Sequence, residues 1–259
     1  MKNKKISYIL PTRRQMSLAY PVIDALFRLP PHDFELIIAC HERFFSEELL
    51  SNNQIKLVKD TSGTGACNPA NDAYKISDGD YICLMSDDIM YPQNFLDIIP
   101  WMESDNVQKR RFKLANIMWD GGADGIVNGE PIYLWLNGHD DLEDGKWHWP
   151  SQDPIIASIA PYSYLIMPFV ERETMEKEFA GHLFPPEFRH HYGDHWMGLY
   201  VSKNETFNPF CNWRCPTIKY IPLAHLALTN ANHDTQDLNT FHSFCLKWKN
   251  NHNVSYLGK

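Results

Sequence analysis

The first hundred residues alternate between short apolar runs and amphipathic stretches, a pattern typical of β-α units that feed a mostly parallel sheet. The apolar runs predict four strands, at residues 6–10, 34–39, 55–58 and 81–84. A helix before Pro30 and Pro31 is indicated by the spacing of Ala19, Val22, Ile23 and Leu26. Two more helices are expected, one over 66–76 and one after Pro92 whose apolar face is Phe95, Ile98, Ile99 and Met102.

The pattern degrades between residues 103 and 153, where short aromatic segments are separated by turn dipeptides. Pairs such as Gly121-Gly122 and Asn128-Gly129 favour hairpins and loops over helices. Further on, the sequence predicts a strand at 163–170 and helices at 171–179 and 194–202. The stretch beyond 217–221 is polar and rich in Asn and His, and we expect a C-terminal tail there.

Composition narrows the class of protein. The chain has 259 residues, 44% of them hydrophobic, enough for one large globular domain or two small lobes that share a core. A formal charge of −8 without a basic run makes nucleic acid an unsuitable main partner. The apolar stretch behind Lys4 and Lys5 is only residues 6–10, so we expect no signal peptide and no membrane span. Six dispersed cysteines indicate a reducing cytosol, so a cytoplasmic protein is expected.

The sharpest chemical feature is a strand at 81–84 that runs into Ser86, Asp87 and Asp88. Ligands of open α/β sheets bind outside the carboxyl ends of the strands, so these acids stand where a ligand is expected. Adjacent carboxylates repel each other unless a cation or solvent separates them, and a phosphate-bound Mg or Mn ion would do so. The alternative is a simple Asx turn after the strand.

Residues around this strand follow the order G-x5-N-x7-G-D-Y-I-x4-D-D, from Gly65 and Asn71 to Asp88. This order resembles the donor-binding half of family 2-type inverting glycosyltransferases of the GT-A fold. The resemblance implies an α/β fold with a GT-A-like, Rossmann-like, mostly parallel central sheet flanked by helices. It also implies that Gly65, Asn71, Ser86 and Asp87 belong to the nucleotide-sugar site. Ser86 replaces the first acid of the family's D-x-D, so Asp88 would bind the metal and Asp87 would face the ribose or the diphosphate.

The loop after the first strand also resembles the family's nucleotide-facing loop, through Pro11 and Thr12. Arg13 and Arg14 follow, and they either pair with the diphosphate or point to solvent. This loop contains no glycine, which argues against the main rival enzyme, a sugar-phosphate nucleotidyltransferase with a Gly-rich loop. After the second strand the family commonly has Asp-Asp-Gly-Ser, whereas this chain has residues 39–42 as Ala-Cys-His-Glu, which leaves the nucleobase open.

The catalytic base of the resembled family lies in a Glu-Asp pair at the start of a helix, and Asp194 matches the Asp of that pair. Gly193 replaces the Glu. Asp194 on its own is also a good residue to cap the predicted helix at 194–202. Its distance of about 105 residues from the donor motif is normal for the family, so the resemblance implies that Asp194 is the general base.

Twelve histidines suggest a metal, but their spacing does not match a zinc motif. Cys211, Cys215 and His225 are only a weak match to a zinc site because no second close pair completes them. In some enzymes that this chain resembles, a late histidine returns to the metal of the D-x-D. His225 is therefore a candidate metal ligand beside Asp88, and its alternative is a hydrogen-bonded core histidine.

The resemblance predicts a single GT-A-like domain, with a nucleotide-sugar half at 1–102, an acceptor half at 103–225 and a tail at 226–259. The implied reaction is transfer of a sugar from a nucleotide-diphosphate sugar to a hydroxyl of a glycan or other glycoconjugate, with inversion and with Mn or Mg. Aromatic residues between 119 and 164 suit either an acceptor groove or a core. The rival from another class is a sugar- or nucleotide-binding module without catalysis.

Overall fold

A computed structural model describes most of the chain. The described residues are 4–12, 16–61, 65–87, 91, 93–120, 126–127, 130–131, 155, 167–190, 192–204, 212–216 and 231–259. All structural statements below concern these residues.

The centre of the molecule is a seven-stranded sheet with the order β3-β2-β1-β4-β8-β5-β9. Its strands are β1 (Ile6–Pro11), β2 (Phe34–Cys40), β3 (Ile55–Lys59), β4 (Tyr81–Leu84), β5 (Leu114–Asp120), β8 (Met167–Glu171) and β9 (Asn212–Pro216). The register places Ile6 of β1 opposite Phe34 of β2 on one side and Tyr81 of β4 on the other. The second half of the chain thus extends the sheet that the first half begins.

Only β8 runs against its neighbours in this sheet, because it pairs antiparallel with both β4 and β5. The pairs β1-β2, β1-β4, β2-β3 and β5-β9 are all parallel. The mostly parallel sheet predicted from the sequence is therefore confirmed.

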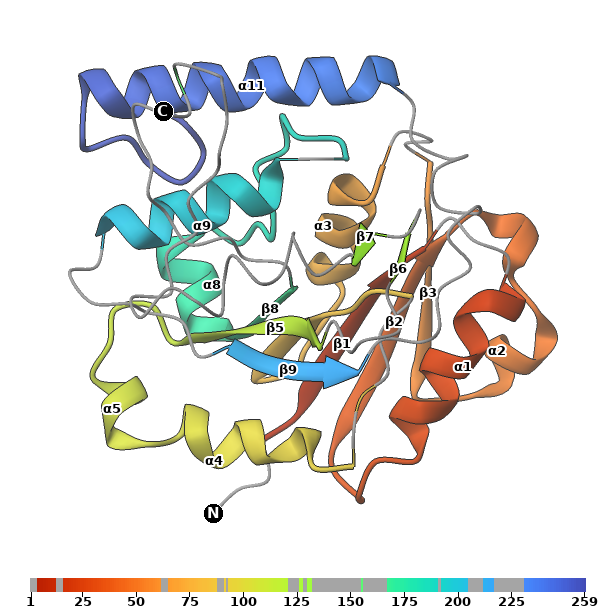
Figure 1. Cartoon of the computed structure of the whole chain (residues 1–259). Coiled ribbons are helices and arrows are strands. Elements are labelled where there is room, and N and C mark those ends of the chain that lie inside the picture. Colours follow the sequence, from red (N-terminus) through yellow and green to blue (C-terminus); the bar gives the residue numbers. More distant parts are fainter. Residues whose placement is uncertain are drawn as a thin grey trace.

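Helices cover both faces of the sheet (Figure 1). Alternate residues of β1 serve opposite faces: Tyr8 belongs to the core under α1 (Met16–Phe27) and α4 (Ile98–Met102), and Ile9 belongs to the core on the other side. The second core contains residues of α3 (Cys67–Lys75), α8 (Arg172–Glu178), α9 (Gly193–Asn204) and α11 (Ala231–Asn250). Since both faces are buried, the strands read as continuous apolar runs rather than as polar-apolar alternation.

Most predicted elements agree with the structure within a few residues. The predicted helical face of Ala19, Val22, Ile23 and Leu26 is buried in α1. The helix expected after Pro92 begins as a short 3₁₀ turn, η2 (Phe95–Asp97), and continues as α4. The strands β6 (Ile126–Val127) and β7 (Glu130–Pro131) pair antiparallel, as expected for the strands of a hairpin, while the Asn128-Gly129 dipeptide itself lies outside the described residues.

Several of the described elements were missed by the sequence analysis. The short helix α2 (Glu47–Ser51) and 3₁₀ turn η1 (Glu42–Phe44) lie between β2 and β3, and α5 (Asp105–Gln108) precedes β5. The expectation of loops and hairpins throughout 103–153 was wrong for β5, an interior strand between β8 and β9. The expected polar tail contains α11, a helix of 20 residues. No described helix has the length and apolar composition needed to cross a membrane.

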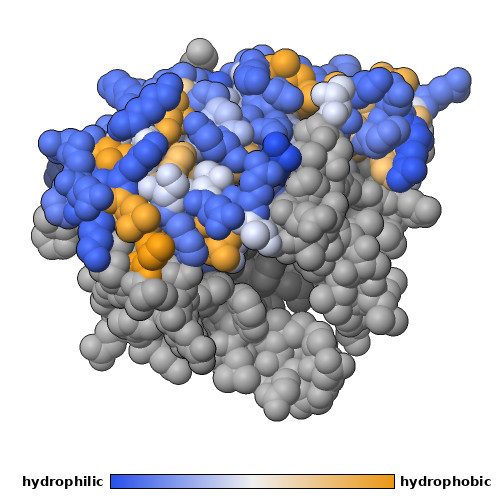
Figure 2. Space-filling model, turned by 90° about the horizontal axis from the view of Figure 1, so that it is seen from above, coloured by the Kyte–Doolittle hydropathy of each residue, from blue (hydrophilic) through white to orange (hydrophobic). Residues whose placement is uncertain are grey.

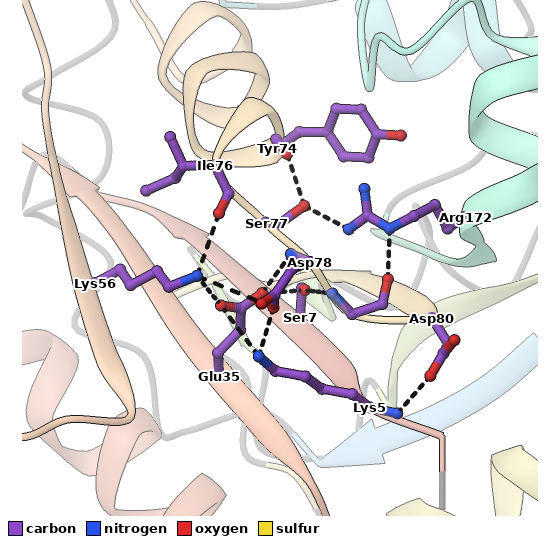
Figure 3. Close-up of polar contacts among 11 residues, drawn as sticks. Lys5, Ser7, Glu35, Lys56, Tyr74, Ile76, Ser77, Asp78, Asp80 and Arg172 are labelled. Carbon is purple, nitrogen blue, oxygen red and sulfur yellow. Dashed lines mark hydrogen bonds and ion pairs between the residues drawn. The ribbon is translucent and has the colours of Figure 1, made fainter. Parts of the chain in front are cut away.

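The turn between α3 and β4 is held by a dense polar network, which explains the Gly79-Asp80 part of the sequence motif (Figure 3). The Gly79 N–H donates to Ser7 Oγ (2.8 Å), and a Cβ at Gly79 would lie 2.5 Å from the Ser7 backbone nitrogen. Asp80 Oδ2 accepts the backbone N–H of Lys5 (2.9 Å). Only glycine fits against β1 at this point, and the aspartate ties the start of β4 to the start of β1.

Charged groups complete the network at the same turn (Figure 3). Buried Glu35 accepts the Ser7 hydroxyl (2.6 Å) and the Asp78 N–H (2.8 Å), and it pairs with Lys56 at 2.5 Å. The hydrogen bond from Lys5 holds the pKa of Asp78 at about 2, below its usual value of 3.8. These contacts fix where β4 begins, and therefore where the acids after its carboxyl end are delivered.

Candidate active site

The carboxyl ends of β1 and β4 bring two of the predicted site residues into contact. The Thr12 hydroxyl donates to Asp87 Oδ2 at 2.5 Å, and Thr12 is almost fully buried. Backbone hydrogen bonds hold both segments here, from the Thr12 N–H to the Ala39 carbonyl (2.9 Å) and from the Met85 N–H to the Ile9 carbonyl (2.8 Å). Pro11 is the last residue of β1, and Ser86 lies half-buried next to Asp87. The loop after β1 and the acidic motif after β4 therefore meet at the carboxyl ends of these strands, where ligands of open α/β sheets generally bind.

Several predicted site residues fall outside the described residues, namely Arg13, Arg14, Asp88 and His225. The weak zinc candidate is not described either, because Cys211 and His225 lie outside the described residues and only the backbone of Cys215 is described. Among the described residues, no three His, Cys, Asp or Glu side chains gather in a group that could hold a metal ion. Asp87 supplies one carboxylate at the sheet edge, which suits an oxygen-seeking cation but needs further ligands to hold one.

Asn71, a predicted donor-site residue, joins the two halves of the chain. Its Nδ2 donates to the Phe184 carbonyl (2.7 Å), and its Oδ1 accepts the Phe184 N–H (3.0 Å). Asn71 is 4% exposed, so both bonds lie in a dry environment. The side chain thus pairs with a backbone unit as a neighbouring strand would, and it fastens α3 to the segment that leads to α9. A contact of Asn71 with a donor stays a prediction.

Gly65 and the start of α3 meet the same segment a few residues later. Gly65 has a φ of +151°, and a Cβ there would lie 2.1 Å from the Arg189 carbonyl oxygen. That carbonyl accepts the Cys67 N–H at 3.1 Å. Close packing and an unusual backbone conformation both require glycine at this position. Gly65 and Asn71 therefore bring the donor motif and the Asp194 segment together, whatever ligand lies beside them.

Asp194 lies in the first turn of α9, which begins at Gly193, one residue earlier than predicted. It is half-buried, and its Oδ1 accepts the His195 N–H at 2.8 Å. The residue before the helix is Tyr192, whose carbonyl accepts the Trp196 N–H (2.9 Å) and whose φ is +63°. A left-handed conformation costs a non-glycine residue about 1–3 kcal/mol and is held only by its surroundings. The candidate base therefore follows a strained backbone residue.

Gly193, which stands where the resembled family has Glu, is packed against Phe184. A Cβ at Gly193 would lie 2.8 Å from Cδ1 of the Phe184 ring, which is 5% exposed. A larger residue would have to displace this ring and disturb the bonds between Phe184 and Asn71. The departure from the family pattern thus has a steric cause, and Asp194 remains as the carboxylate at this helix start.

The charge of Asp194 affects the pKa of Cys67 at the start of α3. Burial raises the pKa of the Cys67 thiol well above its usual value, and the negative charges of Asp194 and Asp237 raise it further. Cys67 is therefore a neutral thiol and is not suited to act as a nucleophile. Cys40, Cys67, Cys83 and Cys245 are all buried, as the dispersed cysteines suggested.

Asp237 of α11 was missed by the sequence analysis. It is fully buried, and its two carboxylate oxygens accept the backbone N–H groups of Arg189 (3.0 Å) and His190 (2.7 Å). A helical signal was present, because buried positions recur with helical spacing, at Asp237, Phe241, Phe244, Cys245 and Trp248. The polar residues between them led to the interpretation of a tail.

No known protein-family profile matches the sequence, and no curated protein was found to be similar to it. Solved structures are similar in fold. S. aureus TarS (residues 1–349) in complex with UDP-GlcNAc is 14% identical with a TM-score of 0.57, over 96% of this chain and 72% of that chain. The mannosyltransferase PcManGT from Pyrobaculum calidifontis, in complex with GDP-Man and Mn2+, is 12% identical with a TM-score of 0.54, over 95% and 63%.

A third similar structure is glucosyl-3-phosphoglycerate synthase from Mycobacterium tuberculosis, in complex with Mn2+, UDP and glucosyl-3-phosphoglycerate. It is 16% identical with a TM-score of 0.52, over 93% of this chain and 80% of that chain. These neighbours are nucleotide-sugar glycosyltransferases of the GT-A type. At such identities the likeness concerns the fold, and this chain has the GT-A fold that the motif order implied.

Proposed function

We propose that this protein is a glycosyltransferase that moves a sugar from a nucleotide-diphosphate sugar to a hydroxyl acceptor, with inversion at the anomeric carbon. The observation that carries the proposal is the meeting of Thr12 and Asp87 at the carboxyl ends of β1 and β4. It occurs in a fold whose similar solved structures are complexes with UDP-GlcNAc, with GDP-Man or with UDP. The donor would lie across this edge, in contact with Pro11, Thr12, Ser86 and Asp87.

Asp194 is the proposed general base. A hydroxyl is a very weak acid, so its attack on the anomeric carbon requires a group that accepts its proton, on the face opposite the leaving diphosphate. The Asp194 carboxylate is half-buried, and the Gly65-Arg189 junction ties its segment to the donor half of the sheet. Holding donor and acceptor in line would itself supply a large part of the rate, about 7–11 kcal/mol at the limit.

Asp88 and His225 are the proposed metal ligands, with Arg13 and Arg14 as further partners of the diphosphate. Carboxylate oxygen and imidazole nitrogen together suit Mn, and oxygen ligands alone suit Mg. When bound, a divalent ion would stabilise the negative charge of the departing diphosphate. Thr12 would orient Asp87 through its hydrogen bond, so that the Asp87 carboxylate keeps one oxygen committed to the protein.

Donor binding is tested first, by thermal shift with UDP, GDP, dTDP and CMP sugars, with and without Mn. A ligand that binds the folded state alone raises the melting temperature by mass action. The donor that shifts it is then incubated with Mn, and release of the nucleotide is followed. Release without an acceptor indicates an enzyme, whereas binding without release indicates a non-catalytic binding module. If no nucleotide sugar shifts the melting temperature, the proposal is wrong.

Asp194→Asn tests the mechanism, because asparagine keeps the shape and accepts the His195 N–H but cannot take a proton. We expect unchanged donor affinity and a kcat lower by about 10²–10⁴-fold, the usual contribution of a general base. Asp72→Asn is the matched control, since Asp72 is a partly exposed residue of α3 whose ion pair is with Lys75. A kcat close to wild type in Asp194→Asn would exclude Asp194 as the base.

A further inference from the structure

Helix α11 contacts the segment before Asp194 through two side chains that lie one helical turn apart. Asp237 accepts the N–H groups of Arg189 and His190. Phe241 stacks on the ring of Tyr192, with centroids 5.6 Å apart and the planes 24° from parallel. Both Asp237 and Phe241 are fully buried. In Figure 1, α11 runs above α9 and α3, across the side where the two halves of the chain meet.

The contacts of α11 include a residue with a strained backbone, Tyr192. Tyr192 has a φ of +63°, and the bulk of a tyrosine side chain opposes this conformation. Its ring packs against the rings of both Phe241 and His195, with centroid distances of 5.6 and 5.3 Å, and those two rings lie 6.0 Å from each other. The preceding N–H groups at Arg189 and His190 are directed toward α11 by a single carboxylate. Side-chain packing on one side and charge-assisted hydrogen bonds on the other thus hold the unusual backbone in place.

A second contact ties the same few residues to the donor half. The carbonyl of Arg189 accepts the Cys67 N–H and packs against Gly65, while the N–H of Arg189 donates to Asp237. The backbone of Arg189 is therefore hydrogen-bonded to α3 through its carbonyl and to α11 through its N–H. Residues 189–192 lead directly into the first turn of α9, so their position sets the position of Asp194.

We propose that Asp237 and Phe241 are positioning residues for Asp194, and that α11 acts as a clamp that holds Arg189, His190 and the strained Tyr192 in place. This inference rests on the proposed function, because the orientation of the Asp194 carboxylate matters only if Asp194 is the general base. Neither residue is expected to touch substrate. A change of the backbone at Tyr192 would rotate the start of α9 and displace the carboxylate two residues later.

The outer surface of α11 offers no other explanation for Asp237 and Phe241, such as a docking site for a partner. Viewed from the side of α11, the described surface is largely hydrophilic, with scattered hydrophobic residues and no large apolar patch (Figure 2). Both side chains instead point inward to the segment before α9. Asp237 and Phe241 therefore support an internal segment of the protein rather than an external contact.

The test compares Asp237→Asn, Phe241→Leu and the control Trp248→Leu. Trp248 lies two turns further along α11 and contacts Tyr200 at the other end of α9, so its loss destabilises the same helix pair without touching Tyr192. At a temperature where all variants are folded, we expect kcat to fall about 10- to 100-fold in the two clamp variants, as a misplacement of about 1 Å would cause. The KM for donor should stay near wild type in them, and Trp248→Leu should keep both constants.

A double variant separates clamping from general loss of packing. Asparagine adopts a positive φ more readily than tyrosine, so Tyr192→Asn reduces the strain that the clamp must hold. Phe241→Leu should therefore lower kcat less in a Tyr192→Asn background than in wild type. Equal fold-losses in both backgrounds would overturn the clamp.

Hydrogen exchange distinguishes failure of this inference from failure of the proposed function. The His195 N–H bonds to Asp194 and the Trp196 N–H bonds to Tyr192, so these amides report on the start of α9. We expect their exchange to be faster in Asp237→Asn and Phe241→Leu, and unchanged in Trp248→Leu. If wild type transfers no sugar, the proposed function fails, and these amides still decide on the clamp. Unchanged exchange in the clamp variants, or equal acceleration in Trp248→Leu, would overturn it.

Discussion

Asn71→Ala is the most informative single substitution outside the proposed catalytic residue, because it decides between two roles for this side chain. In the structure, Asn71 makes two hydrogen bonds to the backbone of Phe184, 113 positions away in the sequence. Alanine removes both and leaves a buried N–H and a buried carbonyl without these partners. Each such group costs about 1–3 kcal/mol, so the free energy of unfolding should fall by about 2–6 kcal/mol. A water molecule that enters the vacated space would bring the loss toward the lower end.

The assay is thermal unfolding without any ligand, followed by donor titration. A loss of this size lowers the melting temperature by roughly 5–20 °C in a chain of about this length. Asp72→Ala is the control on the same helix, where an exposed ion pair with Lys75 is lost and the change should stay within about 0.5 kcal/mol. If Asn71→Ala melts like Asp72→Ala but weakens donor binding, Asn71 is a donor ligand, and the reasoning from the Phe184 bonds is refuted.

The remaining predictions concern the turn before β4 and the proposed metal site. Gly79→Ala should lower the free energy of unfolding by about 1–3 kcal/mol in urea titrations, because the new Cβ would lie 2.5 Å from the Ser7 backbone; a neutral result would contradict the close approach. Because the pKa of Asp78 is lowered to about 2, its stabilising effect is complete above pH 3.8 and is lost as the pH falls through 2. The melting temperatures of wild type and Asp78→Asn should therefore differ at pH 6 and converge toward pH 2, whereas a constant difference would argue against the ion pair. Asp88→Ala should abolish Mn-dependent donor binding in calorimetry, and wild-type affinity would make Asp88 a turn residue. His225→Ala should weaken the dependence of the rate on Mn while the melting temperature is kept; a collapse of the melting temperature would indicate a core histidine instead.

The sequence by itself determined the first half of the sheet and the order of its motifs. Residues 6–10, apart from Ser7, and residues 81–84 are apolar because the sheet is covered on both faces, and such runs are recognisable without knowledge of their neighbours. The motif from Gly65 to Asp87 was also recognisable, because its residue types and their spacing along the chain resemble a known family pattern. The contacts that explain two of its residues, those of Gly79 with Ser7 and of Asp80 with Lys5, became visible only in the structure.

Only the tertiary structure decided what lies around Asp194. The contacts of Gly65 with Arg189, of Asn71 with Phe184 and of Asp237 with His190 join positions 47 to 124 apart, for which the sequence carries no local signal. The strand β5 and the helix α11 were missed for the same reason, because the burial of their apolar residues depends on strands and helices that are distant in the sequence. Burial and backbone strain depend on chain segments that folding brings together, so the strained Tyr192 and the buried Asp237 carboxylate became visible only in the folded molecule.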